Sequence, residues 1–160
     1  MANSNDLHEQ TSLTGAEIDR HSLRGTETIL LADDDKILME ITAEHLEING
    51  YKVLQAFDGV EAVELFKKHI DEIDLVILDA IMPKMTGKQA WNEIRALRPD
   101  VRGCFFSGYA NEVISGKIAI DYSLPFISKP IMPKALLKKM RDILDENNMV
   151  GSVVPSLLDK

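Results

Sequence analysis

The sequence predicts an α/β fold, a three-layer sandwich in which helices cover both faces of a doubly wound five-stranded parallel sheet. Five short apolar runs alternate with stretches whose apolar residues have helical spacing, and this alternation is typical of parallel strands joined by right-handed crossovers. Four of the five apolar runs end directly at a polar or charged side chain. Because parallel strands end at one edge of the sheet, these groups are expected to meet there.

The five apolar runs are the predicted strands. They cover residues 28–32, 52–56, 75–78, 103–106 and 126–128. The run at 75–78 reads LVIL and leads into Asp79, followed by a loop that contains Pro83 and Gly87. The run at 52–56 ends in Ala56 without a reactive group, which suits an edge strand away from a site.

Helices are predicted for the intervening stretches. Residues 36–49 predict a helix that ends at Asn49-Gly50, with an apolar stripe at helical spacing formed by Ile37, Leu38, Ile41, His45-Leu46 and Ile48. Helices are also expected over 60–69, where Asp58 caps the start, over 88–97 and over 133–147. Residues 109–124 have weak periodicity and predict only a short or frayed helix.

Composition and charge limit the classes of function. The chain has 160 residues, a net charge of −8 and a single cysteine, Cys104. The acidic balance argues against a nucleic-acid surface, and no apolar run is long enough to span a membrane. Without a signal peptide or a disulfide framework, the expected setting is the cytoplasm. Residues 1–25 are predicted to be a linker, a tail or a cloning remnant, 26–147 one domain, and 148–160 a C-terminal tail.

The groups at the strand ends point to a cation site. The first strand ends at Asp33 and Asp34, the third at Asp79, the fourth at Ser107 and the fifth at Lys129. Carboxylates about 5 Å apart repel by roughly 3 kcal/mol per pair at an effective dielectric near 20. A proton or cation must relieve that repulsion, and an all-oxygen ligand set with retained waters favours Mg²⁺ over Ca²⁺.

Simpler interpretations exist for each residue. Asp34 and Asp35 precede a helix and could cap it, and Asp79 alone could be a turn residue. Ser107 could form a turn before Gly108 through its hydroxyl, and Lys129 could be a surface lysine beside Pro130. Together, however, a carboxylate beside a metal, with a lysine and a hydroxyl facing it, is equipped for phosphoryl transfer onto the carboxylate.

Four stretches in order, ILLADDD, LVILDAIMPKMTG, FFSGYA and PFISKP, resemble the receiver domain of two-component response regulators. The resemblance covers roughly residues 27–147 and implies a flavodoxin-like sheet with strand order 2-1-3-4-5. It implies that Asp79 accepts a phosphoryl group from a partner's phosphohistidine. Mg²⁺ would be held by Asp33, Asp34, Asp79 and the backbone carbonyl of Ile81. Ser107 would be the switch hydroxyl, Phe126 the switch aromatic, and Lys129 the family's lysine, followed by a cis bond to Pro130.

The sequence also departs from the commonest family pattern. Ile81 is apolar where many relatives are polar, and Phe126 lacks the hydroxyl of tyrosine. The weak helix over 109–124 and the lead-in at 25–28 resemble the receivers of hybrid sensor histidine kinases. The implied partner is a histidine kinase or histidine phosphotransfer protein. No direct contact of this chain with nucleic acid or a membrane is expected. The sequence does not determine the oligomeric state, and a monomer is one of the states it allows.

The isolated domain is expected to catalyse only its own phosphorylation and dephosphorylation, with no effector domain after the last helix. The output surface is expected on the last two helices and the fifth strand. Two other functions stay open. One is a degenerate receiver that acts only as a binding scaffold. The other is a phosphohydrolase with an aspartyl nucleophile, which would need a second acid where Ile81 stands.

Overall fold

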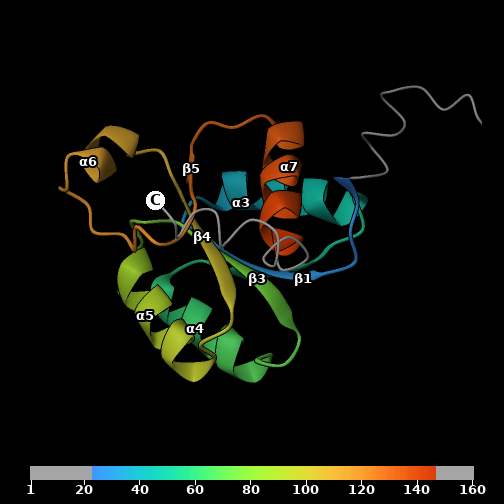
Figure 1. The fold of residues 1–160 in the computed structure, drawn as a ribbon, viewed down its shortest axis with the longest axis horizontal. Coiled ribbons are helices and arrows are strands. Elements are labelled where there is room, and N and C mark those ends of the chain that lie inside the picture. Colours follow the sequence, from blue (N-terminus) through green and yellow to red (C-terminus); the bar gives the residue numbers. More distant parts are fainter. Residues whose placement is uncertain (1–22, 147–160) are drawn as a thin grey trace, which may run out of the picture.

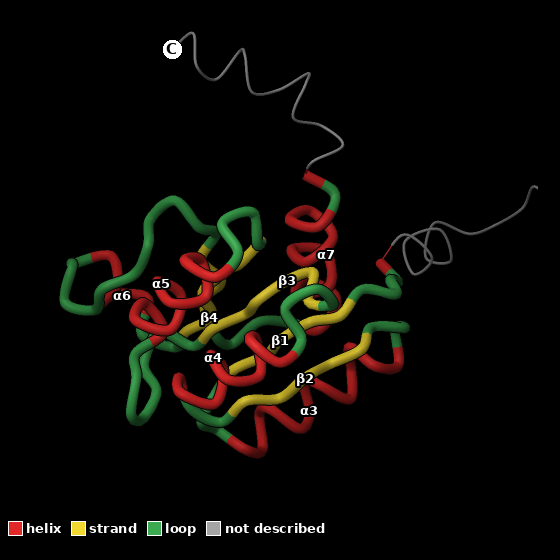
Figure 2. Tube along the Cα trace, turned by 90° about the horizontal axis from the view of Figure 1, so that it is seen from below, coloured by secondary structure: helices red, strands yellow, loops and turns green. Residues whose placement is uncertain are grey.

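A computed structural model of the protein describes residues 23–146. Five parallel strands form one sheet in the order β2-β1-β3-β4-β5, as the sequence predicted (Figure 2). The strands are β1 (Thr28–Ala32), β2 (Lys52–Ala56), β3 (Ile73–Leu78), β4 (Arg102–Ser107) and β5 (Phe126–Ser128). Residues 1–22 and 147–160, which contain most of the predicted N-terminal segment and all of the predicted C-terminal tail, lie outside the described residues.

Helices cover both faces of the sheet. α3 (Lys36–Ile48) and α7 (Pro133–Leu144) lie on one side, while α4 (Gly59–Lys68) and α5 (Gly87–Leu97) lie on the other (Figure 1). The segment predicted to be a short or frayed helix contains only the five-residue α6 (Ala110–Ile114). Residues 115–125, which follow it, are turns, bends and irregular chain.

Local sequence signals define the helix ends. The Asp58 carboxylate accepts from the Glu61 backbone N–H at the start of α4. At the start of α5 the Thr86 hydroxyl accepts from the Gln89 N–H, and the Thr86 N–H donates to the Gln89 side-chain oxygen. Gly50 follows α3 with φ +99°, a conformation that favours glycine. α7 ends at Leu144 rather than Asn147, and its buried face consists of Leu136, Leu137, Met140, Ile143 and Leu144.

α3 turns a different face to the core from the one expected. Ile37, Ile41 and Ile48 are 72%, 60% and 67% exposed. The buried positions are instead Met39, Thr42, Ala43 and Leu46. These follow the i, i+3, i+4, i+7 spacing of one helical face, so the prediction for the three isoleucines was wrong.

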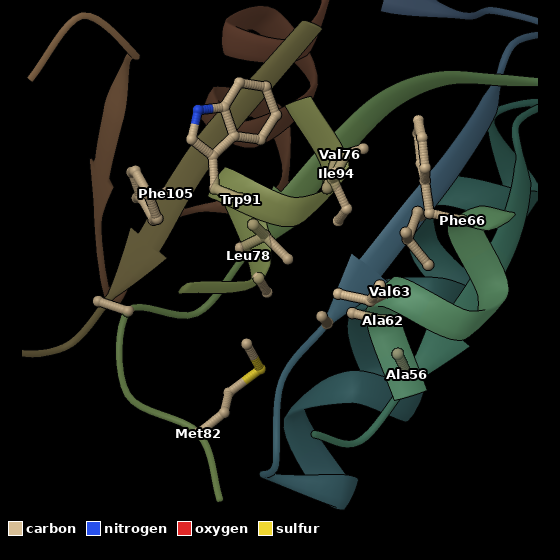
Figure 3. Close-up of a cluster of buried hydrophobic side chains, with 14 of the residues drawn as sticks. Ala56, Ala62, Val63, Phe66, Val76, Leu78, Met82, Trp91, Ile94 and Phe105 are labelled. Carbon is tan, nitrogen blue, oxygen red and sulfur yellow. The ribbon is translucent and has the colours of Figure 1, made fainter. Parts of the chain in front are cut away.

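The two faces of the sheet have separate apolar cores. The core beneath α4 and α5 contains Phe66, Ile94 and Trp91 of these helices together with Leu78 and Phe105 of the sheet (Figure 3). A Cβ at Gly103 would overlap the Trp91 indole, so the glycine makes room for this ring. The second core lies beneath α3 and α7 and includes Cys104, the pKa of whose thiol burial raises to about 12. A thiol in this environment is an unreactive core residue.

Candidate functional site

Three acidic side chains meet at the carboxyl ends of β1 and β3. The carboxylates of Asp33, Asp34 and Asp79, hereafter the acidic rim, each offer an oxygen within 4.8 Å of the others. Asp33 and Asp79 are buried, whereas Asp34 is exposed to solvent. The structure therefore brings together the three carboxylates that the sequence predicted to meet.

Backbone hydrogen bonds beyond the strand ends hold the two buried acids in place. The Asp33 N–H donates to the Ala56 carbonyl at 3.0 Å, and the Asp79 N–H donates to the Ala32 carbonyl at 2.9 Å. Both residues thus continue the sheet by one step. The Asp33 side chain also accepts from the Asp35 backbone N–H at 2.9 Å, which fixes its rotamer.

Lys129 supplies the compensating charge. Its ammonium contacts the Asp33 carboxylate directly and lies 3.5 Å from Asp79 Oδ2. It also lies 5.0 Å from the centre of the Phe106 ring, a cation–π distance. The peptide bond from Lys129 to Pro130 is cis, as the resemblance implied. With three carboxylates to one ammonium, the cluster keeps an excess of negative charge.

Burial raises the pKa of Asp79 to about 6, with Lys129 opposing the rise and Asp33 adding to it. Only 7% of Asp79 is exposed, so water stabilises its charge poorly. The group remains mostly ionised at pH 7. A positive ion at the rim would favour the ionised form further.

Ser107 lies at the end of β4, where it was expected, and is fully buried. Its hydroxyl accepts from the Tyr109 backbone N–H at 3.2 Å, the turn that the simpler interpretation anticipated. Its carbonyl accepts from the Lys129 N–H at 2.8 Å. Among the hydrogen bonds of residues 23–146, none joins the Ser107 hydroxyl to the acidic rim.

The loop after β3 completes the site. The Ile81 N–H donates to Asp79 Oδ1 at 3.4 Å, and the Ile81 side chain is 43% exposed. The Gly87 N–H donates to the Ala80 carbonyl at 3.1 Å. A Cβ at Gly87 would overlap the Asp79 carbonyl oxygen, so this position requires glycine for close packing.

The donor set fits a hard divalent cation. The three clustered side chains all offer carboxylate oxygens, and the exposure of Asp34 leaves room for coordinated water. Asp35, in contrast, caps α3, because its side chain accepts from the Leu38 N–H at 3.1 Å. The simpler interpretation is therefore correct for Asp35.

Residue Phe126 pairs with Phe105 across β4 and β5 and is half-buried against the core beneath α4 and α5.

The structure also contains a polar network, remote from the acidic rim, that the sequence did not predict. The Arg141 Nη1 donates to both Glu27 carboxylate oxygens at 2.8 and 2.9 Å and to the Tyr51 hydroxyl at 3.2 Å. No local spacing signals a contact between residues 114 positions apart.

Comparison with known proteins defines the family. Residues 29–141 match the model of the response regulator receiver domain. The chain is 32% identical over 126 residues to the sensor kinase CckA of Brucella abortus, covering 79% of this chain and 13% of that protein. The chain spans half or less of the curated relatives it matches.

Solved structures agree with this assignment. The crystal structure of the receiver domain from the hybrid histidine kinase CckA has a TM-score of 0.63 at 30% identity, covering 73% of this chain and 98% of that one. The response regulator TrrA of Thermotoga maritima, in complex with Mg²⁺ and BeF, has a TM-score of 0.64 at 26% identity, covering 73% and 98%. The chain belongs to the receiver domain family of two-component systems. No helix within residues 23–146 is long and apolar enough to cross a membrane.

Proposed function

We propose that Asp79 is the phosphoacceptor of this receiver domain and takes its phosphoryl group from a phosphohistidine. The observation that carries the proposal is the position of Asp79, a buried carboxylate beside Asp33, Asp34 and the Lys129 ammonium. In the transfer, an Asp79 oxygen attacks phosphorus while the P–N bond of the donor breaks. The imidazole leaves with a proton, and an acyl phosphate forms.

The other residues stabilise the charge of the transferred group. Lys129 can contact one phosphoryl oxygen as a point charge. The Ser107 hydroxyl can donate to another oxygen after it gives up its bond from the Tyr109 N–H. Asp33, Asp34, Asp79 and the Ile81 carbonyl would hold Mg²⁺, which supplies further positive charge to the phosphoryl oxygens when bound.

The phosphoryl group then serves as the signal. It adds a dianion at the rim, which favours conformations with Lys129 and Ser107 drawn inward. Both residues begin loops, one after β4 and one after β5, so the shift would reach α6, β5 and α7. Phe126 would follow as the switch aromatic, because it stands on β5 next to Phe105.

Chemistry at Ile81 argues against external phosphate esters as substrates. An aspartyl phosphohydrolase needs a second acid two residues after its nucleophile, and the Ile81 side chain cannot donate or accept a proton. A pure binding scaffold is also disfavoured. Buried carboxylates destabilise the fold unless a cation compensates their charge, and a scaffold that binds no metal or phosphoryl group has no need of three of them.

One experiment separates these three functions. The protein is incubated with Mg²⁺ and acetyl phosphate, and any added phosphoryl group is mapped by mass spectrometry. Labelling of Asp79 that disappears in Asp79→Asn supports the receiver. No labelling would favour the scaffold, and turnover of external phosphate esters would favour the hydrolase.

The partner surface should surround the acidic rim, because the phosphohistidine must reach Asp79. Exposed apolar side chains stand beside the rim: Ile37 and Ile41 on the first turns of α3, and Ile81 on the loop after β3. A small cleft of about 190 Å³ lies between α3 and the connection from β5 to α7, with Ile41, Phe106 and Pro130 in its lining. We propose that a helical histidine kinase or phosphotransfer protein in the cytoplasm docks here.

Matched variants on one helix test the docking surface. Ile41→Lys should slow phosphotransfer from a histidine-phosphorylated phosphotransfer protein at least tenfold and leave labelling by acetyl phosphate unchanged. Ile48→Lys is the control, because Ile48 is equally exposed but lies about 10 Å further along α3. Equal transfer rates for both variants would place the partner elsewhere.

A further inference from the structure

One carboxylate attaches the irregular chain between α6 and β5 to α5. Residues 115–125, hereafter the α6–β5 segment, contain no helix or strand. The Asp121 Oδ2 accepts from the Trp91 Nε1–H at 3.2 Å and from the Arg95 Nη1–H at 3.4 Å. Both donors stand on α5, so this contact, hereafter the Asp121 clasp, joins two elements that are distant in the chain.

Local hydrogen bonds fix the Asp121 carboxylate in this position. Its Oδ1 accepts from the Ser123 backbone N–H at 2.9 Å and from the Ser123 hydroxyl, which sets the rotamer within its own turn. The bonds from Ser123, followed by the Trp91 N–H and the Arg95 charge, lower the pKa of Asp121 below its usual value. The carboxylate is therefore ionised at neutral pH, and an ionised acceptor makes the stronger hydrogen bond.

The two partners of the clasp differ in burial. Trp91 is 2% exposed, and its ring lies against the backbone of Gly103 on β4, so the indole is held in place. The Asp121 side chain is 18% exposed and can be solvated where it stands. Loss of the bond would leave a buried indole N–H without its acceptor, which favours the closed clasp. Opening requires movement of the α6–β5 segment alone.

Apolar contacts limit how far the segment can move. Val113 on α6 and Ile120 next to Asp121 are buried in the core beneath α4 and α5. Tyr122, in contrast, is 69% exposed, and its hydroxyl donates to the Val113 carbonyl at 2.9 Å. An open clasp therefore means a local release of the turn at residues 121–125, while the buried apolar side chains keep their places.

Both ends of the segment lead to residues of the acidic rim or beside it. β4 ends at Ser107 before α6, and Lys129 follows β5. The start of α5 is also tied to the site, because Gly87 packs against the Asp79 carbonyl. An inward movement of Ser107 and Lys129 would displace the two ends of the segment while Asp121 holds its middle to α5. The clasp therefore opposes that movement.

We propose that Asp121 is a clasp that restrains the α6–β5 segment in the unphosphorylated protein, and that a phosphoryl group on Asp79 opens it. This inference rests on the proposed phosphoryl acceptance, because the inward movement of Ser107 and Lys129 supplies the displacement. Coupling of this kind is reciprocal, so a change that opens the clasp also favours phosphorylation. The released turn, with Tyr122 on it, would then present a different surface to a partner.

Fluorescence of Trp91, the single tryptophan of the chain, reports the clasp directly. Quenching by acrylamide is measured in the native protein with Mg²⁺ alone and after labelling with Mg²⁺ and acetyl phosphate. Mass spectrometry of the same samples gives the extent of labelling on Asp79. We expect the quenching constant to rise at least twofold on labelling. Unchanged quenching in protein labelled on Asp79 would overturn the clasp and leave the phosphoacceptor intact. Absence of labelling would overturn the phosphoacceptor and the release step together.

Two substitutions at one position separate the clasp from a general effect on folding. Asp121→Ala removes the acceptor, whereas Asp121→Asn keeps an oxygen that can accept from the Trp91 N–H. We expect acetyl phosphate to label Asp121→Ala at least threefold faster than the native chain, and Asp121→Asn at a rate between the two. Asp100→Ala removes an exposed carboxylate beyond the other end of α5 and should match the native rate.

Hydrogen exchange tests the restraint without any phosphate. The Leu124 N–H donates to the Asp121 backbone carbonyl at 3.1 Å, a bond that does not involve the substituted side chain. Its exchange should be at least threefold faster in Asp121→Ala than in the native chain. Native exchange and a native labelling rate in this variant would overturn the proposal, as would slower labelling with an unchanged urea midpoint. If the variant does not fold, the quenching of native Trp91 decides the question.

Discussion

The Lys129 ammonium contacts the Asp33 carboxylate and lies 3.5 Å from Asp79 Oδ2, so one cation serves two buried acids. Lys129 reaches them from the end of β5, 96 residues after Asp33 in the chain. This relationship ties the far strand of the sheet to the candidate phosphoacceptor. It also explains how two carboxylates remain buried side by side in the protein.

Removal of the lysine should destabilise the metal-free protein. Lys129→Gln leaves the buried Asp33 and Asp79 without the ammonium that contacts them, and we expect the free energy of unfolding at pH 7 to fall by about 2 kcal/mol. Urea unfolding in the presence of a chelator measures this change. Lys68→Gln on the exposed surface of α4 should have almost no effect, and equal losses for both variants would contradict the role of Lys129.

Ionisation of Asp79 should cost stability as the pH rises. Its pKa is raised from 3.8 to about 6, so the unfolded chain loses this proton first. Between about pH 4 and pH 6 the folded state binds more protons, and the contribution of Asp79 to stability falls with increasing pH. After allowance for solvent screening of the partly accessible carboxyl, the loss is about 1 to 2 kcal/mol.

Asp79→Asn tests this pH dependence. The variant cannot ionise at this position, so in metal-free buffer its free energy of unfolding should exceed that of the native chain by more at pH 7 than at pH 4. Parallel urea titrations at several pH values measure the difference. A stability difference that stays constant across this range would contradict the raised pKa.

Magnesium should stabilise the folded protein through the acidic rim. A ligand that binds only the folded state raises the free energy of unfolding, by about 2.7 kcal/mol when its concentration is a hundred times its dissociation constant. Asp34→Asn should weaken Mg²⁺ binding at least tenfold, as measured by calorimetry. Asp35→Asn is the control, because it removes the same charge and asparagine can still cap α3. Equal affinities for the two variants would remove Asp34 from the metal site.

The loop after Asp79 should tolerate no side chain at Gly87. Gly87→Ala places a Cβ against the Asp79 carbonyl oxygen, so the loop must shift and phosphorylation by acetyl phosphate should slow about tenfold or more. Gly108→Ala is the matched control at the same rim, since its Cβ would lie 4.0 Å from Lys129 and clash with nothing. The rate of phosphorylation by acetyl phosphate is measured for both variants. A native rate in Gly87→Ala would contradict this packing.

The sequence predicted the fold and the acidic rim because both depend on strand ends. Each apolar run ends where its strand ends, and a parallel sheet collects those ends at one edge. Asp33, Asp34, Asp79 and Lys129 were located by this rule alone. The face of α3 was predicted wrongly because Thr42 and Ala43 hide the buried stripe, while three exposed isoleucines imitate one.

Contacts between distant positions escaped prediction. The Trp91 indole donates to Asp121 Oδ2 at 3.2 Å, which attaches the irregular segment after α6 to α5. Neither this bond nor the pairing of Glu27 with Arg141 leaves a periodic signal, because each joins two single residues across the fold. The sequence likewise did not determine the side-chain conformation of Ser107, because the same hydroxyl can accept a hydrogen bond within a turn or contact a phosphoryl group.

Chemical trapping of the acyl phosphate tests the central claim most directly. The protein is phosphorylated with acetyl phosphate and Mg²⁺, reduced with borohydride, and sequenced by mass spectrometry. Reduction converts an aspartyl phosphate to homoserine. We predict homoserine at position 79 and unmodified aspartate at positions 33 and 34. Homoserine at 33 or 34 with intact Asp79, or none at all, would contradict the assignment of Asp79 as the phosphoacceptor.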